Sequence, residues 1–348
     1  MEEVCHMSNI STADGQALSD PMVAVMGATD QHRADPCDHP ATGSEPVVVS
    51  WGAGVDSTAM ILELVERRER IDMVLLAEMP ERPETLEFIP VFRQWMDAHG
   101  IPNETVRYRP KRFKNWPPYA DLLENCLTNG TLPSVAFSRG ACSAKWKVAP
   151  QDAWVKAWPV AQKAWARGEK VVRLIGFDSG PRDTRRYKNV ADQTNSLFRY
   201  RYPLREWGRQ RPDSEARIRR AGLPVPVASS CFFCTGMQCD EVRTLPQEYL
   251  RQIVLMEARA KPRLRNCEGL WRSSTKGLRG REARPGSMTR FIRDQRLLDP
   301  AEVDRIVAEA PSELVAFIDG ASRLPLSQRP AMGSWLERFD AGALAKAA

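Results

Sequence analysis

Short apolar runs alternate with amphipathic segments through the first half of the chain. The apolar and β-branched runs predict strands at Val47–Val49, Ile71–Glu78, Glu104–Tyr108 and Val171–Phe177. Apolar residues at helical spacing predict helices over about 57–70, 84–99 and 144–166, the second ending at Gly100 and the third interrupted near Pro150 and Pro159. Strands separated by helices predict an α/β fold with a doubly wound, mostly parallel sheet.

The two ends of the chain differ from this alternating region. Residues 1–45 are polar and lack a sustained period, which predicts a flexible leader. From about residue 199 the pattern becomes irregular and rich in arginine, with helices expected near 213–221, 246–260, 300–309 and 311–319. We therefore expect three parts: the leader over 1–45, an α/β domain over 46–240 and a helical, basic region over 241–348.

A glycine-rich turn follows the first predicted strand and leads directly into a helix. Gly52 and Gly54 allow backbone N–H groups to approach an anion, and the N-terminus of the helix adds the positive end of its dipole. An ordinary strand-to-helix turn is the alternative, but the order of strand, turn and helix favours a phosphate site. The predicted phosphate contacts are Ser50, Gly52, Ala53, Gly54, Val55, Asp56, Ser57 and Thr58.

Charge and hydropathy limit the partners. The chain of 348 residues carries a net charge of +6, and 12 Lys and Arg side chains against three acidic ones lie between Arg259 and Arg296. This basic run fits either an RNA or DNA surface or a solvated surface. No stretch reaches the roughly 20 apolar residues of a membrane-spanning helix. The N-terminus lacks the apolar core of a signal peptide, so we expect a cytoplasmic protein without a membrane partner.

The cysteines form the second group of candidate functional residues. Cys231 and Cys234 have the C-x2-C spacing with which two thiolates hold one metal, Cys239 follows them, and Cys142 lies far upstream. All four histidines precede residue 100, so a metal site here must consist mainly of cysteine. Thiolate-rich sites suit zinc or an iron–sulfur cluster, and buried free cysteines are the alternative.

Several segments, taken in order, match one family pattern. The turn reads S-x-G-x-G-x-D-S. Cys142–Pro150 is similar to C-T-x-x-x-K-x-x-P, and Tyr202–Trp207 is similar to Y-P-L-x-E-W. The strand that ends in Gly176-Phe177-Asp178 is followed by Arg182, Arg185 and Arg186, and Ser230–Gln238 contains S-C-F-F-C-x-x-x-Q. Together they resemble the PP-loop ATP pyrophosphatases, in the branch related to phosphoadenylyl-sulfate reductases that is common in phages and mobile elements. The match covers roughly residues 46–240.

The resemblance implies a Rossmann-like fold and an enzyme that binds ATP and Mg²⁺. Such an enzyme adenylates its substrate and releases pyrophosphate. The resemblance assigns Gly176 to the nucleotide site, and Asp56, Ser57, Lys147 and Arg185 to catalysis. It also implies a [4Fe–4S] cluster on Cys142, Cys231 and Cys234, with Cys239 as a further ligand or not, and with Zn²⁺ as the alternative.

Three functions remain open at this point. The first is sulfur transfer or nucleic-acid modification that uses ATP, the cluster and a sulfur-donor protein. The second is reduction of an adenylyl sulfate, although the catalytic cysteine near the chain end of such reductases has no counterpart after Cys267. The third is a nucleotide-binding module without turnover, held by structural zinc.

Overall fold

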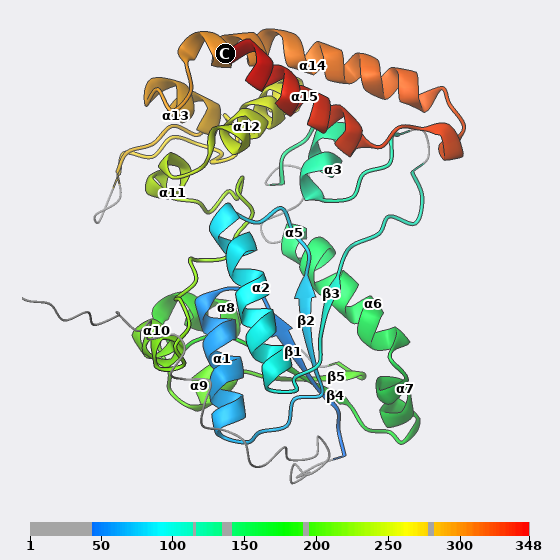
Figure 1. The fold of residues 1–348 in the computed structure, drawn as a ribbon, viewed down its shortest axis with the longest axis vertical. Coiled ribbons are helices and arrows are strands. Elements are labelled where there is room, and N and C mark those ends of the chain that lie inside the picture. The colour runs from blue at the N-terminus through cyan, green and yellow to red at the C-terminus, as the bar shows by residue number, and fades with distance from the viewer. Residues whose placement is uncertain (1–43, 114–115, 134–140, 191–194, 278–281, 348) are drawn as a thin grey trace, which may run out of the picture. The chain divides into compact units, whose positions relative to one another are not determined.

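The computed structural model describes residues 44–113, 116–133, 141–190, 195–277 and 282–347 (Figure 1). Of the predicted leader, only Ser44 and Glu45 belong to this described part.

A five-stranded sheet lies at the centre of the α/β part. Every pair of neighbouring strands is parallel, and the strand order is β3-β2-β1-β4-β5. This confirms the predicted α/β fold with a parallel sheet. The strands are β1 (Val47–Trp51), β2 (Met73–Ala77), β3 (Asn103–Val106), β4 (Val171–Ile175) and β5 (Phe198–Arg201).

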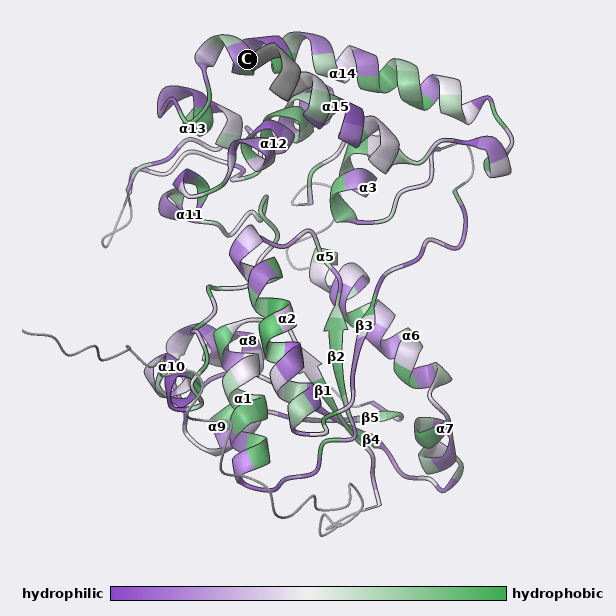
Figure 2. Ribbon diagram, viewed as in Figure 1, coloured by the Kyte–Doolittle hydropathy of each residue, from purple (hydrophilic) through white to green (hydrophobic). Residues whose placement is uncertain are grey.

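The edge strand β5 was not predicted. Its sequence, Phe-Arg-Tyr-Arg, contains two arginines and lacks the apolar run by which the inner strands are recognised. Only Phe198 is buried in this strand, whereas β1 and β2 are mostly buried. Figure 2 shows the inner strand β2 as hydrophobic, whereas helix α10 (Arg211–Arg220) is mostly hydrophilic.

Helices cover both faces of the sheet (Figure 1). One face packs on α1 (Val55–Glu66) and α2 (Pro83–Ala98) through a cluster that includes Val49, Leu76 and Leu174. The opposite face packs on α6 (Ala149–Ala157) and α7 (Pro159–Ala166) through a cluster that includes Val48 and Leu75. Because successive side chains of a strand point to opposite faces, a continuous apolar run serves both layers.

Two predicted helix interruptions are wrong. Pro150 lies near the start of α6, and a π-helical segment over Ala144–Val148 leads into this helix from α5 (Ala141–Ser143), so helical backbone continues past the proline. The break at Pro159 is confirmed, since Trp158 has extended backbone between α6 and α7. The two helices expected around Pro311 are one helix, α14 (Pro300–Ser322), which contains this proline.

The remaining helices build a second apolar core. It contains the cysteine turn and residues of α3 (Leu122–Asn129), α12 (Gln247–Ala260), α13 (Met288–Asp294), α14 and α15 (Met332–Ala347). Helix α3 packs against α12, so a segment between two strands of the sheet belongs to the helical part. Short helices α8 (Pro181–Lys188), α9 (Pro203–Glu206) and α11 (Cys239–Arg243) complete the chain. In the part of the chain that the structure describes, no helix has the length and apolar character needed to cross a bilayer.

Candidate functional site

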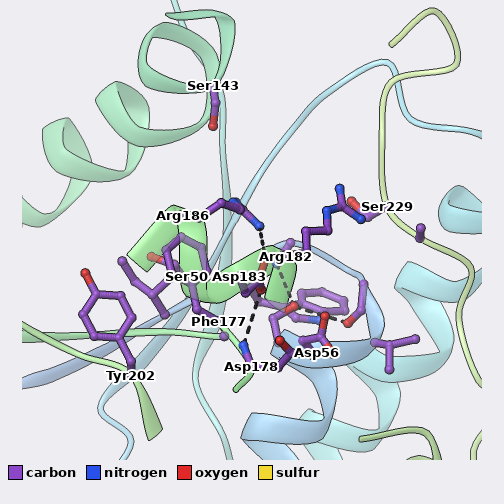
Figure 3. Close-up of a pocket in the computed structure, with 18 of the residues that line it drawn as sticks. Ser50, Asp56, Ser143, Phe177, Asp178, Arg182, Asp183, Arg186, Tyr202 and Ser229 are labelled. Carbon is purple, nitrogen blue, oxygen red and sulfur yellow. Dashed lines mark hydrogen bonds and ion pairs between the residues drawn. The ribbon is translucent and has the colours of Figure 1, made fainter. Parts of the chain in front are cut away.

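A cavity of about 730 Å³ lies at the carboxyl ends of β1 and β4 (Figure 3). These two strands are neighbours, but the chain leaves them in opposite directions, since β2 and β3 lie on one side and β5 on the other. Open parallel sheets bind ligands at such a switch point. The lining includes the turn after β1, the turn after β4 and the first residues of α8.

The glycine turn forms one wall of the cavity. The Gly52 N–H donates to Oγ of Ser57 (3.2 Å), and the same hydroxyl donates to the carbonyl of Gly54 (3.3 Å). Between them Ala53 adopts a left-handed conformation with φ of 55° and is fully buried. The turn is therefore held by its own hydrogen bonds and packing before any ligand binds.

Helix α1 begins at this turn with free donors. Its N-cap is Gly54, which has no side chain that could cap the helix. The N–H groups of the first turn, from Val55 to Ser57, have no carbonyl partner within the helix. These donors and the positive end of the helix dipole make the start of α1 a site for an anion.

Most of the predicted phosphate contacts line this cavity, and two do not. The residues that line it are Ser50, Gly52, Gly54, Val55, Asp56, Ser57 and Gly176. Ala53 is buried behind the turn. Thr58 is also fully buried, and its hydroxyl accepts a hydrogen bond from Nε1 of Trp51 (3.0 Å). The predicted hydroxyl donor at Thr58 thus holds the turn against β1.

Three carboxylates lie around one part of the cavity (Figure 3). Burial raises the pKa of Asp56, the charges of Asp178 and Asp183 add to the increase, and Arg211 opposes it. Oδ2 of Asp56 lies 3.4 Å from Nη1 of Arg211. Its Oδ1 is buried without a hydrogen-bond partner among the described residues. A cation near this oxygen would satisfy it.

The sequence did not single out Asp178 and Asp183 as site residues. Asp178 follows β4 and accepts a hydrogen bond from the N–H of Gly180 (2.8 Å). Asp183 pairs with Arg186 (3.0 Å) within α8. Asp178 follows a strand whose carboxyl end lies next to the glycine turn, and this position could have identified it as a site residue.

Lys147 lies on the π-helical segment and reaches the cavity from the second face of the sheet. Its ammonium pairs with Oε1 of Glu81 (3.1 Å), and Oε2 of Glu81 accepts from the Ser229 hydroxyl (3.2 Å). Burial alone would lower the pKa of Lys147, but Glu81 and the nearby thiols of Cys231 and Cys234 more than offset it, so the pKa is raised. Lys147 is therefore a permanent cation between the cavity and the cysteine turn.

Arg185 does not line the cavity. It is exposed on α8, and its neighbours Arg182 and Arg186 on the same helix line the cavity instead. The guanidinium of Arg186 lies over the Phe177 ring at 4.3 Å.

The structure brings three of the four predicted metal ligands into one region. Burial raises the pKa of the Cys231 and Cys234 thiols, and the nearby Cys142 thiol adds to the increase in both. Cys239 lies elsewhere, with its thiol hydrogen-bonded to Glu282. Within the described ranges, no group of three or more His, Cys, Asp or Glu side chains is arranged so that it could hold a metal ion.

The basic run from residue 259 to 296 makes many contacts within the protein. Arg263 donates to the carbonyl of Asn129, Arg284 donates to that of Met237, and Arg293 pairs with Asp304 (3.1 Å). Residues 278–281 of this run lie outside the described residues. Part of the predicted nucleic-acid surface therefore stabilises the helical region.

The chain was compared with known proteins. No family model matches it, and no curated protein matches it either.

Proposed function

We propose that this protein is a PP-loop enzyme that binds ATP, transfers its adenylyl group to a substrate oxygen and releases pyrophosphate. The observation that carries this proposal is the position of the glycine turn, which lines a cavity at the switch point of a parallel sheet. The family pattern of the turn supports the same assignment.

The donors around the turn suit a triphosphate. The first-turn N–H groups of α1 would bind the β- and γ-phosphates and stabilise the charge of the leaving pyrophosphate. Lys147, Arg182 and Arg186 would add charge from the other walls. Among the described residues, five Lys and Arg side chains and four carboxylates line the cavity: Lys147, Arg173, Arg182, Arg186 and Arg211, and Asp56, Glu81, Asp178 and Asp183.

Asp56 is the residue best suited to hold Mg²⁺. Its buried Oδ1 lacks a partner among the described residues, and Asp178 and Asp183 lie close enough to influence its charge. Carboxylate oxygens are preferred ligands of Mg²⁺. Bound Mg²⁺ would neutralise charge on the phosphates, and Asp56 would hold the ion near the start of α1.

We further propose that Cys142, Cys231 and Cys234 hold a [4Fe–4S] cluster. The three thiols share one region beside Lys147, and soft thiolates suit this group. A cluster with three protein ligands would supply an open iron for sulfur transfer. Zinc on the same cysteines is the alternative.

The proposal is tested by calorimetry of ATP binding to the full chain in the presence of Mg²⁺. A valine at Gly54 would place methyl groups beside the turn, and its Cβ would lie 3.4 Å from Cβ of Ser229. Gly54→Val should abolish binding, whereas Gly320→Ala, whose Cβ meets no atom within 4 Å, should not change it. Binding that survives Gly54→Val in folded protein contradicts the proposal. Release of sulfite from adenylyl sulfate with thiol and without ATP would favour the reductase function instead.

A further inference from the structure

A second cavity of about 610 Å³ runs along the edge strand β5. It lies beside the first cavity, because Val190, Tyr200 and Tyr202 line both. The two cavities therefore share a wall that contains these three residues. The remaining lining residues are Lys170, Tyr187, Asn195, Phe198, Arg199, Arg201, Arg205 and Glu206.

The lining combines cations with aromatic rings. Among the described residues, the lining contains four cations, Lys170, Arg199, Arg201 and Arg205, and one carboxylate, Glu206. Along β5 and the residue after it, arginine alternates with an aromatic residue, and both kinds of side chain line this cavity at the edge of the sheet. Base stacking on aromatic rings next to a positively charged groove is the way in which proteins hold single-stranded nucleic acid.

The cations of this cavity can exchange their partners for phosphate. Arg205 donates to the carbonyl of Asp178 (2.7 Å) and the Thr184 hydroxyl (3.0 Å), and neither partner neutralises its charge. Arg199 pairs with Glu45 while half of its side chain is exposed to solvent. Such exposed ion pairs contribute little, so a phosphate can replace the carboxylate.

The aromatic side chains already form a stacked array. Tyr202 stacks on Phe177 with ring centroids 5.5 Å apart (Figure 3). Tyr187 meets Tyr202 edge to face at 4.9 Å. The guanidinium of Arg205 covers the other tyrosine of this pair, Tyr187, at 4.5 Å. Tyr200, the remaining tyrosine of the lining, lies against Phe198 with ring centroids 6.2 Å apart, so it loses little freedom when a base stacks on it.

We propose that the second cavity binds the acceptor as a single-stranded nucleic acid. Lys170 and Arg199 bind its phosphates, a base next to the target stacks on Tyr200 at the shared wall, and the target base enters the first cavity. The role as acceptor rests on the proposed function, whereas the binding itself does not. An acidic peptide would use the cations but leave the tyrosines without a partner.

The test is fluorescence anisotropy with labelled 12-nucleotide single strands of RNA and DNA, titrated with the full chain at several salt concentrations. Replacing both Lys170 and Arg199 by Ala removes two phosphate contacts and should reduce the slope of log K against log salt by about 1.4. Tyr200→Leu should weaken binding about tenfold, and Tyr200→Phe, which retains the ring, should restore it.

The matched control is the double replacement of Arg290 and Arg293 by Ala on α13. Both arginines are exposed and ion-paired, as Arg199 is, and both belong to the basic run near the C-terminus. This control should leave the affinity unchanged. An equal loss in the control, or equal competition by oligoglutamate of the same charge, overturns the proposal.

Calorimetry of ATP binding separates the two proposals. Lys170 and Arg199 line only the second cavity, so their double variant should bind ATP as the unchanged chain does. Oligonucleotide binding without ATP binding would refute the proposed function and leave the second site in place. ATP binding without oligonucleotide binding at about 50 mM salt would refute the second site alone.

Discussion

Gly176, at the end of β4, lies directly against the backbone of Ser57 in the first turn of α1. A Cβ at position 176 would lie 2.8 Å from Cα of Ser57 and 2.9 Å from its nitrogen. Only glycine allows this approach, and the approach places the carboxyl ends of β1 and β4 around one cavity. The candidate phosphate site thus depends on two turns that are more than 100 residues apart.

The first prediction concerns this contact. Gly176→Ala should displace the start of α1, because the new methyl group meets backbone atoms that cannot rotate away. We expect a loss of about 1–3 kcal/mol in the free energy of unfolding and at least about tenfold weaker ATP binding. Denaturant titration and calorimetry measure the two effects. Gly320→Ala, which is free of such contacts, should leave ATP affinity unchanged, and unchanged affinity in Gly176→Ala would contradict the interpretation.

The second prediction concerns Asp56. Burial raises its pKa above 3.8, so its contribution to stability is present below that pH and is lost as pH rises through the pKa of the folded state. Asp56→Asn should therefore be more stable than the unchanged chain near neutral pH. Pyrophosphate release with Mg²⁺ and ATP should nevertheless fall at least about tenfold, because the proposed metal ligand is lost.

Thermal unfolding and a pyrophosphate assay of the same samples check both parts of this prediction. The exposed Asp240 offers the control, since Asp240→Asn removes a carboxylate far from the cavity lining. Full activity of Asp56→Asn would show that the reaction does not need this carboxylate.

The third prediction concerns Glu124 in α3. Burial raises its pKa from 4.5 to about 7. The charges of Asp121 and Glu337 add to this increase, and the hydrogen bond from the N–H of Ala120 reduces it. The carboxyl therefore stabilises the fold below about pH 4.5, and this contribution is lost as pH rises toward 7. Glu124→Gln should raise the free energy of unfolding at pH 8 by about 1–3 kcal/mol but not at pH 4.5.

Urea unfolding at the two pH values measures this difference. Glu313 on α14 is exposed, so Glu313→Gln should show no such pH dependence. An equal effect of Glu124→Gln at both pH values would show that the protonation of this carboxyl is not the cause.

The fourth prediction concerns the cysteines. Protein purified without oxygen should contain iron and sulfide and should show the broad visible absorption of a thiolate-bound cluster. Cys231→Ser should remove both, because Cys231 shares its region with Cys142 and Cys234. Cys239→Ser should retain them, since the Cys239 thiol is bonded to Glu282. Colourless protein with one equivalent of zinc would identify the metal as zinc.

The inner strands and the glycine turn could be predicted from the sequence because their signals are local. A buried parallel strand needs an apolar run, and a strand that turns at once into a helix needs small residues, as at Gly52 and Gly54. Edge strand β5 gave no such signal, because one side of it faces a polar cavity lined by Arg199 and Arg201. The position of α3 also could not be predicted, since its packing on α12 joins segments far apart in the chain.

The sequence by itself determined an α/β chain with a glycine-rich turn between strand and helix and a C-x2-C pair, because spacing within one strand, helix or turn fixes these features. Only the tertiary structure shows that Asp178 and Asp183 lie near Asp56 and that Arg185 does not line the cavity. It also shows that the Cys239 thiol is bonded to Glu282 and does not lie with the other thiols. It also shows that Tyr200 and Tyr202 line both cavities. These relationships depend on how parallel strands align and on the direction each helix face takes after packing, and neither is encoded by residues adjacent in the chain.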